Sequence, residues 1–291
     1  MMRNDQAKKL RELVGSSTPS FHSTTSHTIA IVSGKGGVGK TNFTVNFAIS
    51  LAREGKRVLI FDMDLGMGNV HLLLGASPSF HMMDYIYEKQ PLAEVIETYG
   101  SLISFISGGS QLEEIVHWSP LMVERLFEAF QQLEKEYDYI LFDMGAGVTE
   151  RSLDIIESVD DVIVIATEEP TSITDAYSMM KFLTLRNMST NISIVSNRVE
   201  NRKHPYDVAK RLQYAMSRFL NKEILILGYI EEDPIVRESV IARVPYVQYN
   251  PHSTTSLNMR RSVARFLGKK DLDGSQKQSF LDKMKRWLKR G

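Results

Sequence analysis

The stretch "IAIVSGKGGVGKTNFT", residues 29–44, decides the fold. It begins as an apolar run and passes through a glycine-rich segment that ends in Gly39-Lys40-Thr41. Together with Gly34 this gives the spacing of a phosphate-binding loop between a strand and a helix. Glycines let successive backbone N–H groups turn toward phosphate oxygens, and the following helix N-terminus adds positive partial charge. We therefore predict nucleotide binding, with Lys40 on the β- and γ-phosphates and Thr41 on Mg²⁺.

Short apolar runs alternate with amphipathic stretches from His27 onward. Runs such as "RVLIFDMD" and "DVIVIAT" lack polar alternation, which is typical of strands covered on both faces. Helical patterns lie between the runs at 41–54, 119–136, 171–188 and 205–220. This order predicts an α/β fold, a single doubly wound, mostly parallel sheet flanked by helices. Ligands are then expected at the carboxyl ends of the strands.

Composition restricts the class of protein. The 291 residues are 43% hydrophobic and 24% charged, which predicts an ordinary globular core. The absence of cysteine excludes disulfides, thiolate zinc sites and cysteine-held iron–sulfur clusters, and it is typical of a reducing cytosol. No apolar run reaches the ~18 residues of a membrane span, and the N-terminus lacks the apolar core of a signal peptide. We expect a cytoplasmic protein.

The chain divides into four predicted parts. Residues 1–26 form a flexible N-terminal segment, because its second half is rich in Ser, Thr, Gly and Pro. Residues 27–267 form the nucleotide-binding domain. The polar stretch "GKKDLDGSQKQS" predicts a linker at 268–279, and residues 280–291 form a terminal helix.

That terminal helix predicts attachment to an anionic surface. Residues 276–291 carry six Lys or Arg and one Asp, so this tail has a charge of +5, and −5 remains on the rest of the neutral chain. One helix face is apolar and the other is basic, which is typical of binding to anionic lipid. The residues concerned are Phe280, Leu281, Met284, Trp287 and Leu288 with Lys285 and Lys289. The alternatives are a helix docked on its own domain and a nucleic-acid tail, although an apolar stripe has no use on a duplex.

The segment "KGGVGKT" resembles the deviant Walker A signature of the MinD/ParA family of ATPases. The resemblance implies that Lys35 reaches the phosphates bound by the second subunit of a nucleotide-sandwich homodimer. There it would neutralise charge on the transferring phosphoryl group, as an arginine finger does. The implied ATP-binding residues of the loop are Gly34, Lys35, Gly36, Gly37, Val38, Gly39, Lys40, Thr41 and Asn42.

The ends of two further predicted strands resemble sequence motifs of the same family. "LIFDMD" ends in Asp62 and Asp64, which lie on one face of a strand because they are two residues apart. By resemblance to switch I, Asp62 lies near the metal and Asp64 positions the attacking water, which makes Asp64 catalytic with Lys35 and Lys40. "YILFDMGAG" resembles a Walker B strand, with Asp143 in the outer shell of Mg²⁺. Switch II would comprise Gly145, Ala146 and Gly147.

ATP is favoured over GTP. "SNRVE" places Asn197 and Arg198 after a strand, where MinD-like proteins recognise adenine. The stretch "NKEI" at 221–224 begins like a guanine motif but lacks the aspartate required at its fourth position. "YIEEDPIVRES" resembles the family segment near base and ribose, which makes Asp233 a further candidate contact.

The N-terminal "DQAKKLREL" resembles the leading motif of the FlhG (YlxH) group, MinD-like ATPases that control flagellar number and placement. The resemblance implies stimulation of the signal-recognition-type GTPase FlhF and contact with flagellar C-ring proteins of the FliM/FliN/FliY type. It also implies reversible peripheral attachment to the cytoplasmic membrane. The activating residues would be Asp5, Gln6, Ala7, Leu10 and Arg11. If the resemblance is set aside, the segment is interpreted as a frayed N-terminal tail.

Three alternatives stay open. A division-site MinD would share the core and the tail, but it normally begins almost directly at the first strand. A ParA-type partition ATPase would need basic surface on the folded body, and the −5 balance of residues 1–275 disfavours nucleic acid. The third is a nucleotide-gated scaffold whose slow hydrolysis is only a timer.

Overall fold

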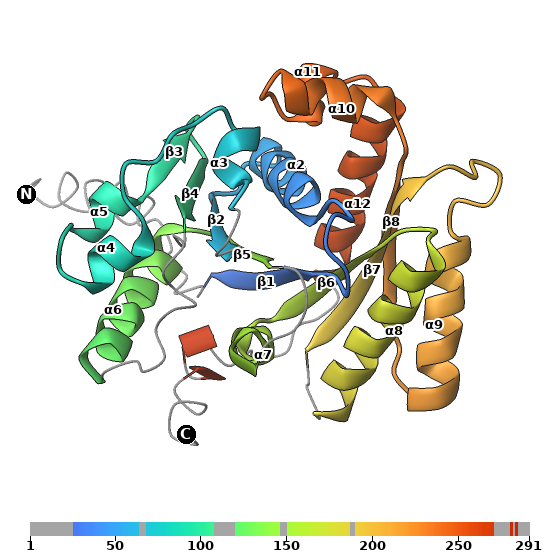
Figure 1. Ribbon diagram of the computed structural model, residues 1–291, viewed down its shortest axis with the longest axis horizontal. Coiled ribbons are helices and arrows are strands. Elements are labelled where there is room, and N and C mark those ends of the chain that lie inside the picture. Colours follow the sequence, from blue (N-terminus) through green and yellow to red (C-terminus); the bar gives the residue numbers. More distant parts are fainter. Residues whose placement is uncertain are drawn as a thin grey trace, which may run out of the picture.

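The computed structural model describes residues 26–63, 68–107, 120–145, 150–186, 190–270, 280–281 and 283–284 (Figure 1). Their strands form one sheet in the order β3-β4-β2-β5-β1-β6-β7-β8. The pairing of β3 with β4 is antiparallel and the other pairings are parallel, which confirms the predicted doubly wound sheet. The strands are β1 (His27–Val32), β2 (Val58–Met63), β3 (Glu97–Tyr99), β4 (Ile103–Ser107), β5 (Tyr139–Met144), β6 (Asp161–Ala166), β7 (Asn191–Val199) and β8 (Leu225–Glu231).

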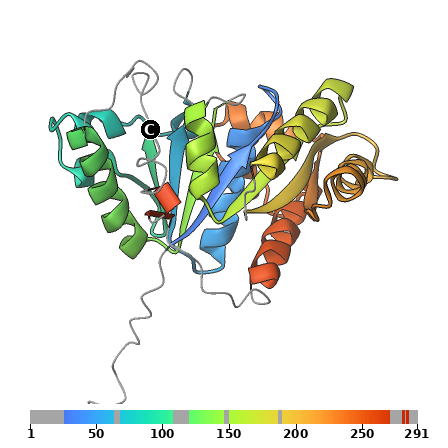
Figure 2. The same ribbon diagram turned by 90° about the horizontal axis from the view of Figure 1, so that it is seen from below.

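Helices cover both faces of the sheet (Figures 1 and 2). One layer consists of α2 (Lys40–Arg53), α3 (Val70–Leu73), α10 (Pro234–Ile241), α11 (Tyr246–Tyr249) and α12 (Thr254–Lys270). The other consists of α4 (Met82–Ile86), α5 (Leu92–Val95), α6 (Pro120–Glu136), α7 (Glu150–Ser158), α8 (Pro170–Leu185) and α9 (Asp207–Leu220). Successive strand residues point to opposite faces, so Ile31 packs in the α2 layer and Val32 in the other.

The four predicted helices match α2, α6, α8 and α9 to within three residues at each end. The short helices α3 to α5 and the edge strand β3 were not predicted, because segments of three to five residues carry too little periodicity. Helix α12 continues to Lys270, three residues into the predicted linker. Its Phe266 ring lies 5.6 Å from that of Phe47 in α2, which fixes this helix on the sheet.

The described part of the tail is docked on the domain. Phe280 is 2% exposed, and its ring lies 5.1 Å from that of Phe130 in α6 and 5.3 Å from that of Phe142 in β5. Leu281 and Met284 are buried in the same cluster. The segment lies between α6 and α7 in both ribbon views (Figures 1 and 2). Phe280, Leu281 and Met284, which were predicted to face lipid, therefore contact the protein's own core here, as in the alternative of a helix docked on its own domain.

An ion pair reinforces this docking. The Lys283 Nζ atom lies 3.1 Å from Asp160 Oδ1 and 3.2 Å from the Val159 carbonyl oxygen. Trp287, Leu288, Lys285 and Lys289 lie outside the described residues, as do Asp5, Gln6, Ala7, Leu10 and Arg11. Within the described ranges, no helix is both long and apolar enough to cross a bilayer.

Candidate nucleotide-binding site

The phosphate loop joins the central strand β1 to α2, at the carboxyl edge of the sheet. Gly37 (φ 76°) and Gly39 (φ 93°) take left-handed backbone conformations, which glycine adopts without steric cost. Gly39 is the N-cap of α2 and supplies no side-chain cap, so the first amides of α2 face the loop concavity. Lys40 begins the helix and is almost fully buried. This is the geometry of an anion site at a helix N-terminus.

Neighbouring elements hold the loop closely. A Cβ atom at Gly34 would lie 2.4 Å from the Asp175 Cβ atom of α8, and one at Gly39 would lie 2.5 Å from Asn197 Nδ2. Asn197 Nδ2 donates a hydrogen bond of 2.7 Å to the Val38 carbonyl oxygen. Asn197, predicted to recognise adenine, therefore also fixes the loop backbone. Val38 contributes its carbonyl to this bond, while its side chain packs in the α2 layer.

Two buried carboxylates lie beside the loop. Asp62 of β2 and Asp143 of β5 are register partners on adjacent strands, and both are almost fully buried. Asp143 Oδ1 accepts a hydrogen bond from Thr44 Oγ1 at 3.0 Å, and Asp62 Oδ2 accepts one from the Val70 amide at 3.2 Å. These contacts fix both carboxylates on the face that carries α2.

This donor set fits Mg²⁺. The ion is usually held by one or two carboxylates together with substrate phosphates and water. Among the described residues, no group of three or more His, Cys, Asp or Glu could hold a metal by itself. Thr41, Asp62 and Asp143 would thus hold the ion only with nucleotide oxygens. Gly145 follows β5 directly, whereas Asp64, Ala146 and Gly147 lie outside the described residues.

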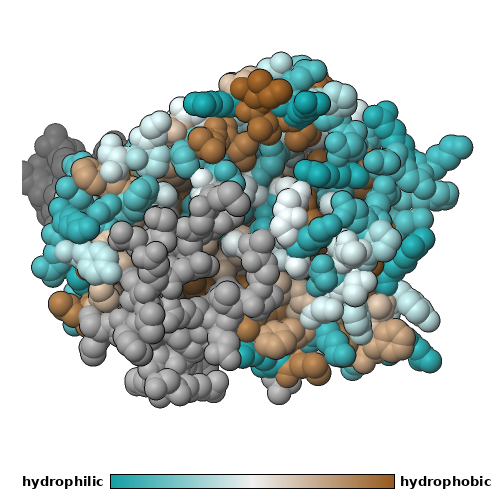
Figure 3. All heavy atoms as spheres, viewed as in Figure 1, coloured by the Kyte–Doolittle hydropathy of each residue, from teal (hydrophilic) through white to brown (hydrophobic). Residues whose placement is uncertain are grey.

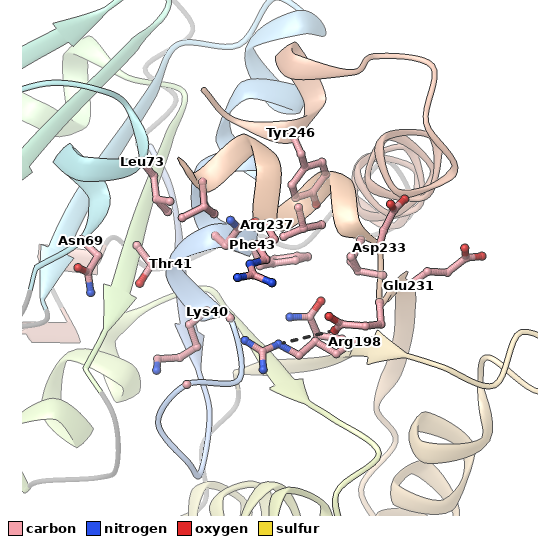
Figure 4. Close-up of a pocket in the computed structure, with 18 of the residues that line it drawn as sticks. Lys40, Thr41, Phe43, Asn69, Leu73, Arg198, Glu231, Asp233, Arg237 and Tyr246 are labelled. Carbon is pink, nitrogen blue, oxygen red and sulfur yellow. Dashed lines mark ion pairs between the residues drawn. The ribbon is translucent and has the colours of Figure 1, made fainter. Parts of the chain in front are cut away.

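A cavity of about 780 Å³ opens from the loop toward α3, α10 and the ends of β7 and β8 (Figure 4). This volume is in the range of small-ligand sites, roughly 300–1,000 Å³. Arg198 and Arg237 extend into the space between the loop and α10 (Figure 4). The predicted residues that line the cavity are Gly36, Gly37, Gly39, Lys40, Thr41, Asn42, Asn197, Arg198 and Asp233.

Two of these residues have specific local roles. Arg198 has a left-handed backbone (φ 53°), which costs free energy in a non-glycine residue and is typical of functional sites. Its Nε atom lies 4.0 Å from Glu232 Oε2, which also lines the cavity. Asp233 caps α10: Oδ1 accepts from the Ile235 amide at 3.0 Å, and Oδ2 accepts from Thr255 Oγ1 at 2.9 Å. Asp233 therefore shapes the cavity wall, and its carboxylate already holds two protein donors.

The far wall of the cavity is apolar, and sequence reasoning missed it. Leu72, Val240 and Ile241 are exposed at its rim, with Ile241 73% exposed. Figure 3 shows apolar side chains gathered at the top of the molecule, over α10 and α11. Tyr246 lies in the same wall, and burial raises the pKa of its hydroxyl, so it stays protonated. Such a wall suits the face of a purine. The sequence carries one signal for this wall: Val236 and Val240 are four residues apart, about one helical turn, and therefore lie on the same face of a helix.

Lys35 is oriented differently from the rest of the loop. It is absent from the described residues that line the cavity. Its Nζ atom lies 2.6 Å from Glu169 Oε2 and 3.4 Å from Thr171 Oγ1, and its side chain is 44% exposed. The hydrogen bond and charge of Lys35 lower the pKa of Glu169. The ammonium group thus lies on the outer rim, while Lys40 lines the pocket.

A family model and similar proteins of known name all assign this chain to one family. A ParA family model, described as NUBPL iron-transfer P-loop NTPase, matches residues 24–267. The antiactivator FleN of Pseudomonas aeruginosa is 32% identical over 229 residues, covering 79% of this chain and 82% of FleN. The flagellum site-determining protein YlxH of Helicobacter pylori is 30% identical over 244 residues and 82% of each chain.

Solved structures share the overall fold of this chain. The septum site-determining protein MinD of Pyrococcus horikoshii, complexed with Mg-ADP, is 26% identical with a TM-score of 0.67. The match covers 86% of this chain and 96% of that one. MinD in the MinC:MinD complex of Aquifex aeolicus, at 21% identity and a TM-score of 0.69, shares the fold over 87% of this chain and 99% of its own.

Proposed function

Because this chain belongs to the MinD/ParA family of P-loop ATPases and, within it, to the FlhG type, we propose that it is an ATP-switched regulator of flagellar number and placement. One observation carries the switch: Lys40 lies in the nucleotide pocket, whereas Lys35 of the same loop lies outside it. A cation on the rim is placed to meet a second chain. ATP would therefore close a homodimer across the loop face.

The pocket residues have separate roles in this proposal. Lys40 and the amides of α2 bind the β- and γ-phosphates, and Asn197, Arg198 and the apolar wall hold adenine. Thr41, Asp62 and Asp143 would hold Mg²⁺ together with the nucleotide, and the ion would offset the charge of the phosphates. Asp64 positions the attacking water by its hydrogen bond. Lys35 of the opposite chain stabilises charge on the transferring phosphoryl group.

The docked tail supports a membrane switch. Phe280, Leu281 and Met284 of its apolar stripe are buried against the domain in this structure, so a separate subunit does not offer these side chains to lipid. We propose that ATP-dependent pairing releases the tail, and that two basic amphipathic helices then bind anionic lipid together. Hydrolysis returns the protein to a cytoplasmic monomer with the tail docked. A division-site MinD remains the second candidate, because it would share this switch.

Liposome flotation tests the tail. We expect the full chain to float with anionic vesicles when ATP is present and to remain in solution without it. A 1–275 truncation, which lacks the stripe, should remain in solution in both conditions. Vesicles of neutral lipid are the control, since each basic residue near an anionic surface adds about 1 kcal/mol that neutral lipid cannot supply. Equal flotation of the full chain and the truncation would contradict the proposed membrane role of the tail.

A peptide assay tests the proposed flagellar role. The N-terminal motif supports a contact with FlhF, and FliM/FliN/FliY-type C-ring proteins are proposed as further partners. A peptide of residues 1–23 is expected to raise the GTPase rate of FlhF severalfold. A peptide with Gln6→Ala should lose most of this stimulation, because Gln6 is the residue proposed to enter the partner's site. No stimulation by the unchanged peptide would contradict the FlhF contact and favour the division-site alternative.

A further inference from the structure

The ion-pair partner of Lys35 is Glu169, which lies at the start of α8. Glu169 stands at the N-cap position of α8, yet its side chain makes no capping bond. Its carboxylate instead bonds Lys35 across 134 residues of sequence. The pair is exposed on both sides, with 58% of the Glu169 side chain accessible. Glutamate is not among the residues that usually cap a helix N-terminus, which are Ser, Thr, Asp and Asn, and here its longer side chain reaches the loop lysine instead.

The surrounding structure fixes the geometry of the pair. Gly34, which precedes Lys35, packs directly on Asp175 of α8, so the loop and the start of α8 lie against each other. Thr171 supplies a second oxygen, 3.4 Å from Lys35 Nζ. Arg198 at the cavity mouth is the other cation acting on Glu169, and its charge lowers the pKa of Glu169 further. Lys35 and Arg198 thus both favour the charged form of Glu169, and Lys35 is the one that bonds it directly.

We propose that Glu169 is the positioning residue of Lys35: it holds the ammonium outside its own pocket and competes for it with the triphosphate of the second chain. This inference rests on the proposed role of Lys35 in trans. An ammonium has three donors, and Glu169 and Thr171 already accept from two of them, so phosphate oxygens of the second chain would have to compete with these contacts. Pairing of two chains therefore requires both ion pairs of a symmetric dimer to open.

The size of the effect follows from the exposure of the pair. An exposed ion pair shifts an equilibrium by up to about fivefold. Because the dimer opens two of them, the combined effect on the dimer dissociation constant reaches about 25-fold at most. Glu169 would therefore set the ATP concentration at which the chains pair, without touching nucleotide in its own subunit.

The test is the substitution Glu169→Gln, which keeps the shape of the side chain and removes its charge. We expect the dimer dissociation constant, measured by sedimentation with a slowly hydrolysed ATP analogue and Mg²⁺, to fall by about fivefold to 25-fold at low salt. The difference should shrink as salt is raised, because exposed charges are screened. An unchanged or larger dissociation constant would overturn the inference.

Two variants separate this inference from the proposed function. Glu168→Gln removes the neighbouring carboxylate, which accepts from the Glu200 amide and not from Lys35, and it should leave the dissociation constant unchanged. In a Lys35→Ala background, Glu169→Gln should not restore pairing, because the cation that it would release is absent. If Lys35→Ala abolishes pairing but Glu169→Gln does not tighten it, only the role of Glu169 is wrong. If Lys35→Ala pairs like the parent, the proposed function is wrong and this inference with it.

Discussion

Replacing Lys35 by alanine is expected to abolish ATP-dependent pairing and to lower ATP turnover by about 10³-fold or more, the usual contribution of a trans-acting cation in phosphoryl transfer. The physical reason is charge. Two triphosphates facing each other across a dimer interface repel strongly, and in this proposal Lys35 is the cation that each chain sends across the interface to offset that repulsion. The measurement is sedimentation with ATP and Mg²⁺, followed by steady-state turnover.

The same variant should still bind ATP as a monomer. Lys35 does not line its own cavity, so the dissociation constant for ATP should change by no more than a few-fold. Lys89→Ala is the matched control, since Lys89 is also an exposed lysine in an ion pair, with Asp84, far along the chain from the loop. Turnover near that of the parent in Lys35→Ala would contradict the account.

Replacing Lys40 by alanine should remove ATP binding itself. Lys40 is buried at the start of α2 and lines the cavity, so its ammonium is the fixed counter-charge of the phosphates. Losing its charge-assisted hydrogen bonds should weaken binding by about 100-fold, since each contributes roughly 1.5–3 kcal/mol. The measurement is the rise in unfolding temperature that ATP and Mg²⁺ produce, because a ligand stabilises the state that binds it.

Lys35→Ala and Lys40→Ala serve as controls for each other in this assay. ATP should raise the unfolding temperature of Lys35→Ala and leave that of Lys40→Ala nearly unchanged at the same concentration. A similar stabilisation of both variants would mean that the loop does not hold the phosphates as described. A loss in both would mean that Lys35 also contributes to binding within its own chain.

The phosphate loop and the sheet could be predicted because their signals are local. The loop pattern places Gly39, Lys40 and Thr41 between a buried strand and a helix, and each step is decided by neighbouring residues. The strand-end carboxylates followed for the same reason. Asp62 and Asp143 end apolar runs, and a parallel sheet brings such ends to one edge.

The remaining features depend on contacts between distant parts of the chain. The tail's apolar stripe fits lipid and protein equally well in sequence, and only the Phe130 and Phe142 rings show which surface covers Phe280 in this structure. Asn197 was assigned to adenine, but its bond to the Val38 carbonyl spans 159 residues. Likewise, no local pattern pairs Glu169 with Lys35. Local sequence patterns therefore predict the loop and the strand-end carboxylates, whereas these three long-range contacts came from the structure.

The most direct measurement mixes two inactive variants, Lys35→Ala and Asp64→Asn. In a mixed dimer, the ATP bound by the Lys35→Ala chain keeps its own Asp64 and receives Lys35 from the other chain. Because Lys35→Ala chains do not pair with each other, complete sites form in the mixed dimers, one in each, and turnover should rise well above that of either variant alone, to at most about half of the parent's. If Lys35 acts within its own chain, no complete site exists in any dimer, and the mixture would stay as inactive as its components.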